Sequence, residues 1–252
     1  MHPLDRDLQV AYFKLEEARS QRIRFQRILH PETMRWAKRG GPPPVTDTKM
    51  LRITALADLG FAETFYQSMA VKEIEAKAEL EELASQHILW PHFERIKGLS
   101  LYLCGAFVAA SGDIERCNTV TSFWSGMGLG LNPDGTVPRR IRGKKIGKPM
   151  PCLPHVSMIG EQIRMQMIRF TGGNLRRRYD AAREIYDAKF PDRPKMYNFK
   201  AALRHVQKLL YACLWAAWRE GRGLEAPMPY PFIWLGHSQS SMLTISDFYD
   251  KE

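Results

Sequence analysis

The amino-acid sequence predicts a mainly α-helical protein. We expect a long N-terminal helical hairpin or coiled coil, followed by a helical helix-hairpin-helix domain that carries a basic loop or β-ribbon. Two observations predict this fold class. Apolar residues recur at alternating spacings of three and four along most of the chain, which places them on one stripe of a helix. Clusters of glycine and proline separate these periodic segments, as helix breakers do.

The composition excludes several classes of protein. With 252 residues, of which 44% are hydrophobic and 25% charged, the chain has the composition of an ordinary globular protein. Its longest apolar stretch, residues 99–111, is shorter than the roughly 18 residues that a membrane-spanning helix needs. Charges throughout the first thirty residues argue against a secretory signal, and the four cysteines include no C-x-x-C pair. We therefore expect a cytoplasmic protein without a membrane segment, metal site or cofactor.

The first ninety residues predict two long helices. One apolar stripe ends before Pro31, because proline disfavours a helical conformation of the preceding residue. A breaker at residues 40–44 separates it from a second helix over residues 47–87, which we expect Trp90 and Pro91 to close. Arg22 interrupts the first stripe, and the glutamates of the second helix indicate a solvated face. The stripe consists of Leu8, Ala11, Leu15, Ala18, Arg22, Phe25 and Leu29, and the glutamates are Glu73, Glu75, Glu79, Glu81 and Glu82.

A glycine turn follows at residues 96–100, before an apolar helix over residues 101–111 that Gly112 ends. With the acidic helix before it, this layout is typical of a helix-hairpin-helix, whose turn N–H groups and second helix start face a phosphate. We expect Lys97, Gly98, Leu99 and Ser100 to bind nucleic acid. Ser100 stands where the motif has a second glycine, so an ordinary corner between two helices is the alternative.

Basic charge is concentrated in one quarter of the chain. Residues 116–179 hold twelve Lys and Arg against two acids, an excess of ten that equals the net charge of the whole chain, +10. Such concentration favours a polyanionic partner, although a solvated basic face without a partner is the alternative. Six cations lie in a loop or β-ribbon without helical period and are expected to contact phosphates. They are Arg139, Arg140, Arg142, Lys144, Lys145 and Lys148.

The remaining segments predict further helices. A short helix over residues 120–126 leads into a glycine-rich loop that lacks the Gly-Lys-Ser/Thr of a nucleotide-binding loop. Helices follow over residues 156–170, 175–188 and 197–219. The second of these begins with Arg176, Arg177 and Arg178, which we expect to bind nucleic acid. The third places Phe199, Leu203, Val206, Leu210, Leu214 and Ala217 on a core face, with Trp215 and Trp218 beside them. Residues 226–252 form a tail rich in proline and aromatic residues, either a docking strap or a loose end.

The order of these motifs resembles one family of proteins. Over residues 90–222 the chain resembles the serine-bearing, C-terminal half of the DEDD-type insertion-sequence transposases that a bridge RNA guides, which are related to the Piv-type invertases. The motifs are Ile96-Lys97-Gly98-Leu99, Gly112-Asp113-Ile114, Ser125-Gly126-Met127, Asn174-Leu175-Arg176 with Tyr179, Lys208-Leu209-Leu210 and Arg219-Glu220-Gly221. The resemblance implies a helical linker over residues 1–90, a nucleic-acid-binding domain over 91–225 and the tail over 226–252.

The same resemblance implies partners and a biological setting. It implies binding of DNA and structured RNA by a homodimer or higher oligomer that forms through the N-terminal helices. It also implies a prokaryotic, phage or mobile-element context.

Two departures from the family bear on catalysis. In the family a RuvC-like domain with metal-binding acids precedes the linker, and we expect this chain to lack it. The family's nucleophile is a serine before a glycine, and an ungapped count from Gly126 places Asp134 there. A carboxylate cannot form the phosphoserine link to DNA that this strand exchange requires. We therefore expect no catalytic residue.

Three functions remain open at this stage. The first is a transposase-derived nucleic-acid-binding protein without strand-transfer chemistry of its own. The second is an enzyme, either one subunit of a split transposase or recombinase or a hydrolase without a recognisable motif. The third is a helical scaffold whose basic loop binds an acidic partner protein.

Overall fold

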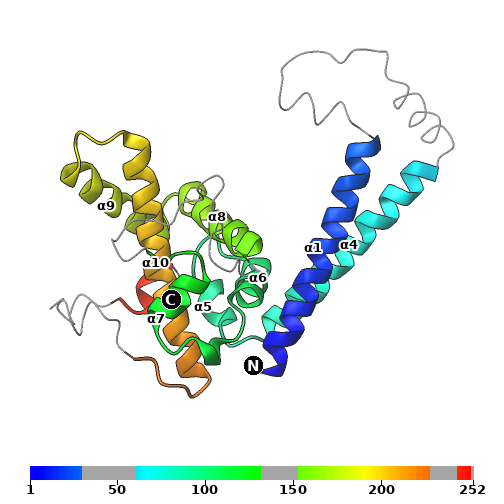
Figure 1. The fold of residues 1–252 in the computed structure, drawn as a ribbon, viewed down its shortest axis with the longest axis horizontal. Helices are drawn as coiled ribbons and strands as arrows, with labels where there is room; N and C mark the ends of the chain where they lie inside the picture. Colours follow the sequence, from blue (N-terminus) through cyan, green and yellow to red (C-terminus); the bar gives the residue numbers. More distant parts are fainter. Residues whose placement is uncertain (30–60, 132–152, 228–242, 251–252) are drawn as a thin grey trace, which may run out of the picture. The chain divides into compact units, whose positions relative to one another are not determined.

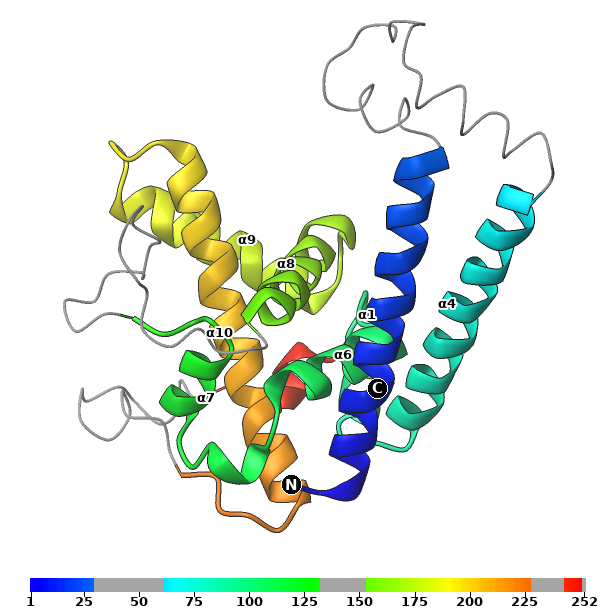
Figure 2. The same ribbon diagram turned by 45° about the vertical axis from the view of Figure 1, so that its right-hand side comes forward.

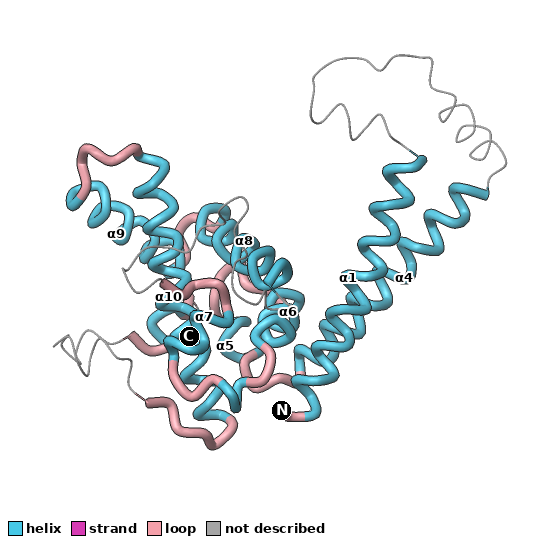
Figure 3. The backbone as a smooth tube through the Cα atoms, in the orientation of Figure 1, coloured by secondary structure: helices cyan, strands magenta, loops and turns pink. Residues whose placement is uncertain are grey.

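The computed structural model describes residues 1–29, 61–131, 153–227 and 243–250, and these ranges contain helices and no strand (Figure 3). The mainly α-helical prediction is therefore confirmed for the described part of the chain. None of the described helices combines the length and the apolar character that would let it cross a membrane. The helices are α1 (Pro3–Leu29), α4 (Phe61–Ser85), α5 (Trp90–Glu94), α6 (Leu101–Ser111), α7 (Val120–Gly126), α8 (Leu153–Arg169), α9 (Asn174–Lys189) and α10 (Lys195–Gly221), with 3-10 turns η1 (Ile114–Arg116) and η3 (Ile245–Phe248).

The chain forms two compact units, each with its own contacts. The two-helix unit spans Val10–Glu82, and the larger unit combines Met1–Gln9 with Leu83–Glu252. In the two-helix unit, α1 and α4 run antiparallel and side by side (Figures 1 and 2). Leu15 of the predicted stripe is fully buried, as are Leu80 and Ala76 of α4. These buried residues show that α1 and α4 each have an apolar face in this unit.

Ion pairs connect the two helices of this unit. The Nε atoms of Arg19 and Arg22 lie 3.2 and 2.5 Å from the two carboxylate oxygens of Glu73, and Lys14 pairs with Glu79. The prediction that the α4 glutamates form a solvated face is therefore wrong for Glu73, whose side chain is only 17% exposed. The same pair explains the cation in the apolar stripe, because Arg22 meets a carboxylate from the facing helix.

The pKa of Glu73 reflects these neighbours. Burial acts to raise it, but the hydrogen bonds from Arg22 and Arg19 outweigh burial and hold the pKa of Glu73 below its ordinary value of 4.5. The Glu73 carboxylate therefore stabilises this unit in its charged form.

After α4 the chain departs from the predicted boundaries. Trp90 and Pro91 do not close the acidic helix, which ends at Ser85, but begin the separate helix α5. Proline fits the first turn of a helix, where its missing N–H would have no acceptor within the helix. The helix directly before the 96–100 turn is therefore the five-residue α5, and the expectation of an acidic helix there was wrong. Residues 47–60 of that predicted helix lie outside the described residues.

Helix α10 forms the centre of the larger unit. Helices α7, α8 and α9 and the turns η1 and η3 all pack against it, while α6 packs against α5 and α8. The predicted core face of α10 is confirmed at Leu203, Val206, Leu210 and Leu214, and Trp215 and Trp218 are almost fully buried. Phe199 and Ala217 of the same prediction are only half-buried. Helix α6 buries every residue from 103 to 110, as its uniformly apolar sequence requires.

A buried arginine connects α10 to the loop that follows α6. Arg219 is 6% exposed, and its guanidinium donates to the carbonyl oxygens of Ile114 at 3.1 Å, Cys117 at 3.3 Å and Glu225 at 2.6 Å. The indole N–H of Trp215 donates to the Cys117 carbonyl at 2.9 Å. A buried charge is tolerated when its donors are hydrogen-bonded in this way. Arg219 therefore fixes η1 against the end of α10.

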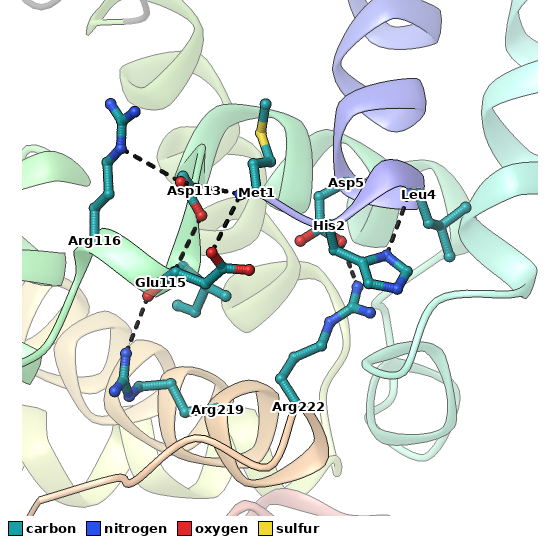
Figure 4. Close-up of polar contacts among 10 residues, drawn as sticks. Met1, His2, Leu4, Asp5, Asp113, Glu115, Arg116, Arg219 and Arg222 are labelled. Carbon is teal, nitrogen blue, oxygen red and sulfur yellow. Dashed lines mark hydrogen bonds and ion pairs between the residues drawn. The ribbon is translucent and has the colours of Figure 1, made fainter.

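The start of α1 belongs to the larger unit and carries a buried carboxylate. Asp5 Oδ1 accepts a hydrogen bond from Arg222 Nη2 at 2.6 Å (Figure 4). The same oxygen lies 3.1 Å from His87 Nε2. His87 Nδ1 accepts the N–H of Leu89, which leaves Nε2 to donate to Asp5. Burial lowers the pKa of His87, and Asp5 only partly opposes that effect. A neutral, oriented imidazole therefore connects α1 to the segment before α5.

We predict that Glu73→Gln weakens the α1–α4 pair by about 1–2 kcal/mol at pH 7, because two guanidinium groups lose their charged acceptor. Amide hydrogen exchange of α4 should accelerate by roughly 5- to 30-fold. The pKa of Glu73 is lowered in the folded state. The folding stability that its carboxylate contributes is therefore present above pH 4.5 and is lost as the pH falls through the folded-state pKa. The difference between variant and parent should therefore shrink in acid.

Glu75→Gln is the matched control, because Glu75 lies on the same helix and is exposed. Equal acceleration of α4 exchange by both variants would contradict the role given to Glu73.

Candidate nucleic-acid interface

The 96–100 turn has the local geometry of a tight connection between two helices. Gly98 has φ +93°, and a Cβ atom there would lie 2.5 Å from Cδ2 of Phe170, so only glycine fits. Ser100 is the N-cap of α6, and its Oγ accepts the N–H of Leu103 at 3.3 Å. This capping role explains why a serine occupies the place of a second glycine. Ile96 and Leu99 are buried, whereas Lys97 is exposed.

The three arginines at the start of α9 have different surroundings. Arg176 pairs with Asp180 at 2.8 Å, and Arg177 donates to the side-chain oxygen of Asn174 at 3.1 Å. Arg178 donates from Nε and Nη2 to the carbonyl oxygen of Asp247, at 3.1 and 2.9 Å. Successive helical residues point about 100° apart, so three adjacent cations cannot share one partner. Arg177 is the exposed member of the three.

The structure brings the 96–100 turn and the start of α9 to one point, around the carboxylate of Asp250. Asp250 Oδ2 accepts the backbone N–H of Lys97 at 2.6 Å, and Oδ1 accepts the backbone N–H of Asn174. Gly173 lies next to both donors. A Cβ atom on it would lie 3.3 Å from Asp250 Oδ1 and 3.3 Å from the Lys97 Cβ, so a side chain there would crowd the carboxylate. Two segments that the sequence predicted separately as anion-binding therefore converge on one acidic group.

Asp250 belongs to a docked stretch, the C-terminal segment (residues 243–250). Phe248 is fully buried beneath the Arg178 guanidinium, whose carbon lies 4.9 Å from the ring centroid. The Tyr249 hydroxyl contacts His92 Nδ1, and the backbone N–H of Asp250 donates to the carbonyl of Arg95 at 2.8 Å. Of the two alternatives for the tail, the docking strap is thus found for residues 243–250, while residues 228–242 lie outside the described residues.

Asp247 organises the C-terminal segment internally. Its side chain accepts the backbone N–H of Thr244 at 2.8 Å, and its Oδ1 lies 3.3 Å from Arg178 Nη2. The hydrogen bond from the Thr244 backbone, together with the Thr244 hydroxyl and Arg178, lowers the pKa of Asp247, although burial opposes this shift. Asp247 is therefore a charged carboxylate held against α9.

Acidic side chains neutralise several cations of the basic window. Arg116 pairs with Asp113 and Arg164 with Glu161, in addition to the pairs of Arg176 and Arg178. Three of these four carboxylates lie outside residues 116–179, so a count within that window overstates the free charge. Arg169 and Arg177 have no carboxylate partner among the described residues. The six cations of residues 139–148 and Asp134 lie outside the described residues.

Two cations of α10 contact the end of α7 and the start of the glycine-rich loop; Arg204 was not identified from the sequence, and Lys208 was quoted only as part of a motif. Arg204 donates to the carbonyl oxygens of Gly128 and Gly130, at 3.4 and 2.9 Å. The Lys208 ammonium lies 4.3 Å from the ring centroid of Trp124. Burial lowers the pKa of both side chains, and Arg164 adds to this effect at Arg204. Their spacing of four residues on one helix was the available signal.

The described residues contain no group of three or more His, Cys, Asp or Glu that could hold a metal ion. Burial raises the pKa of the Cys213 thiol to about 12 and raises that of Cys104 as well, which disfavours the reactive thiolate. Neither thiol is thus an activated nucleophile. Comparison of the chain with protein-family models, curated proteins and solved structures finds no match. The resemblance to transposases therefore rests on the order of the motifs quoted above.

We predict that Gly98→Val reduces nucleic-acid binding while the far-UV circular dichroism remains largely helical. A β-branched residue resists positive φ, and its Cβ would displace Phe170 from the turn. Gly223→Val is the control, since Gly223 also has positive φ (+68°) but no atom lies within 4 Å of an added Cβ. Both variants should melt at lower temperature. Equal affinities of the two folded variants would indicate that the turn is an ordinary corner between two helices.

Proposed function

We propose that this chain is a transposase-derived nucleic-acid-binding protein, which binds DNA or structured RNA through phosphate contacts. One observation carries the proposal. The backbone N–H groups of Lys97 and Asn174, one from a glycine turn and one from the first residue of a 16-residue helix, both donate to a single anionic group. Backbone N–H groups at a helix start, together with the helix dipole, suit a phosphate oxygen.

The distribution of charge supports the same function. The pairings of Arg116, Arg164, Arg176 and Arg178 leave Arg169 and Arg177 as the described cations of the basic window without a carboxylate partner. Residues 139–148 add six more cations to that window. Flexible cations that follow a phosphate backbone provide affinity and salt dependence rather than sequence specificity. The transposase resemblance implies the same class of ligand.

The proposed protein lacks strand-transfer chemistry of its own. Asp134 stands at the position that matches the family's serine, and covalent catalysis needs a nucleophile held beside an activating group. One subunit of a split transposase is the enzymatic alternative, and co-purification with a chain bearing an acidic metal site would favour it.

A scaffold that binds an acidic protein is the second candidate, and one observation favours it. The group that the Lys97 and Asn174 amides contact is a protein carboxylate, that of Asp250. An acidic peptide would offer the same chemistry. Competition between a polyglutamate peptide and duplex DNA discriminates the two, because a scaffold would bind the peptide more tightly.

We predict that binding to duplex DNA falls steeply with salt. If about six phosphates are neutralised, the slope of log affinity against log salt concentration should be near −5. Changing Arg139, Arg140 and Arg142 to Ala should flatten that slope by about 2–3. Fluorescence anisotropy of a labelled duplex at several salt concentrations measures both values.

The matched control changes three exposed cations from other parts of the chain, Arg6, Lys72 and Lys200, to Ala. The same net charge is lost, but the slope should change little. Affinity that does not depend on salt would overturn the proposed function, and equal flattening by both triple variants would overturn the role of residues 139–148.

We predict that the purified chain neither nicks nor joins supercoiled plasmid, with or without magnesium. Two-metal chemistry requires several carboxylates that converge on ions about 3.5–4 Å apart. Asp134→Ser alone should not produce covalent protein–DNA adducts, because a serine by itself is not activated. Gel analysis of the plasmid scores both products. Metal-dependent nicking that a single substitution abolishes would show that the chain is an enzyme.

A further inference from the structure

We propose that the C-terminal segment is a built-in competitor of nucleic acid, in which Asp250 occupies the place of a phosphate until a polyanion displaces it. This inference rests on the proposed function and adds a mode of regulation to the same surface. Its chemistry is a competition between one carboxylate and phosphate groups for two backbone N–H donors.

The contacts of Asp250 are those expected of a phosphate mimic. Its two oxygens separately accept the N–H groups of Lys97 and Asn174, so the carboxylate bridges the turn and the start of α9. Gly173 lets the group approach the backbone, since even a methyl group there would lie 3.3 Å from Oδ1. A carboxylate and a phosphate both present anionic oxygens to such donors. The mimic is therefore positioned by backbone atoms.

The composition of the C-terminal segment matches this role. Residues 243–250 carry two acids, Asp247 and Asp250, and no cation. Both acids lie against the basic start of α9, because Asp247 pairs with Arg178 and Asp250 accepts from Asn174. Displacement of the segment would release the two N–H groups and the Arg178 guanidinium together. One movement would therefore uncover a cation and an anion-binding turn.

The anchoring of the segment determines how displacement can be detected. The Asp250 N–H donates to the Arg95 carbonyl, and the Tyr249 N–H donates to the Ser246 carbonyl at 3.1 Å. These hydrogen bonds protect the two amides from exchange with solvent while the segment is docked. A purely structural clasp would stay protected when nucleic acid binds, whereas a competitor would lose protection.

The first test compares Asp250→Asn with Asp192→Asn for binding to a labelled 20-base-pair DNA duplex and to a labelled RNA hairpin. Asp192 is exposed, so its variant makes the same charge change away from the turn. We expect Asp250→Asn to bind about three- to tenfold more tightly than the parent, because the competing contact is weakened. Asp192→Asn should change affinity far less. Equal affinities of the two variants would overturn the competition.

The second test uses the unmodified chain and does not depend on the folding of a variant. Hydrogen exchange is followed with and without saturating duplex. We expect the amides of Tyr249 and Asp250 to exchange at least several-fold faster in the complex, while those of buried α6 remain unchanged. Unchanged or stronger protection of these two amides in a salt-sensitive complex would overturn the inference alone. Absence of binding by the parent and by Asp250→Asn would overturn the proposed function as well.

Discussion

The larger unit depends on the hydrogen bonds of one buried guanidinium. Arg219 satisfies three backbone carbonyls that come from η1 and from the chain beyond α10. Because η1 follows α6 closely in the chain, these bonds hold the segment that leaves α6 against α10, and α6 itself begins at the end of the 96–100 turn. Replacing the guanidinium by an apolar group would remove one donor from each of these three carbonyls, and a polar group that is buried with fewer hydrogen bonds costs free energy. The position of the candidate interface is therefore linked to the end of α10.

Among the described residues, the 96–100 turn and the start of α9 meet through backbone donors. Arg176 and Arg178, which the sequence predicted to bind nucleic acid, form ion pairs with Asp180 and Asp247. The N–H groups of Lys97 and Asn174 meet at Asp250, and neither is recognisable as part of a pair from composition or charge. Such donors fix the place of a phosphate and read no base, so recognition of a particular sequence would require other groups.

Much of the fold could be predicted because its signals are local. Helices α6 and α7 have the predicted bounds, since Ser100 and Thr119 cap their starts and Gly112 ends α6. Helix α5 was not predicted because five residues are too few to show a helical period. A proline such as Pro91 is also compatible both with the end of one helix and with the first turn of the next. The sequence of the tail fits both a docking strap and a loose end, because its docking depends on residues far away in sequence.

The site was harder to predict, for a related reason. Gly98 and the arginines of α9 were identified, but their convergence depends on the packing of Phe170 against the turn and on Asp250. Likewise, the pairing of Glu73 with Arg22 joins positions in two different helices. Periodicity describes which face of one helix is apolar and contains no information about which charge the neighbouring helix presents. Residues 139–148, which include six of the thirteen predicted binding residues, lie outside the described residues.

The ion pairs of the two-helix unit also affect which helices can pair with each other. On its facing side α1 contributes the cations Lys14, Arg19 and Arg22, while α4 contributes the anions Glu73 and Glu79. Two copies of α1 brought together through this side would oppose cation to cation, and two copies of α4 would oppose anion to anion. The hairpin thus discriminates against self-association of like helices. An oligomer formed through this unit would need either another face or a reciprocal exchange of α4 between chains.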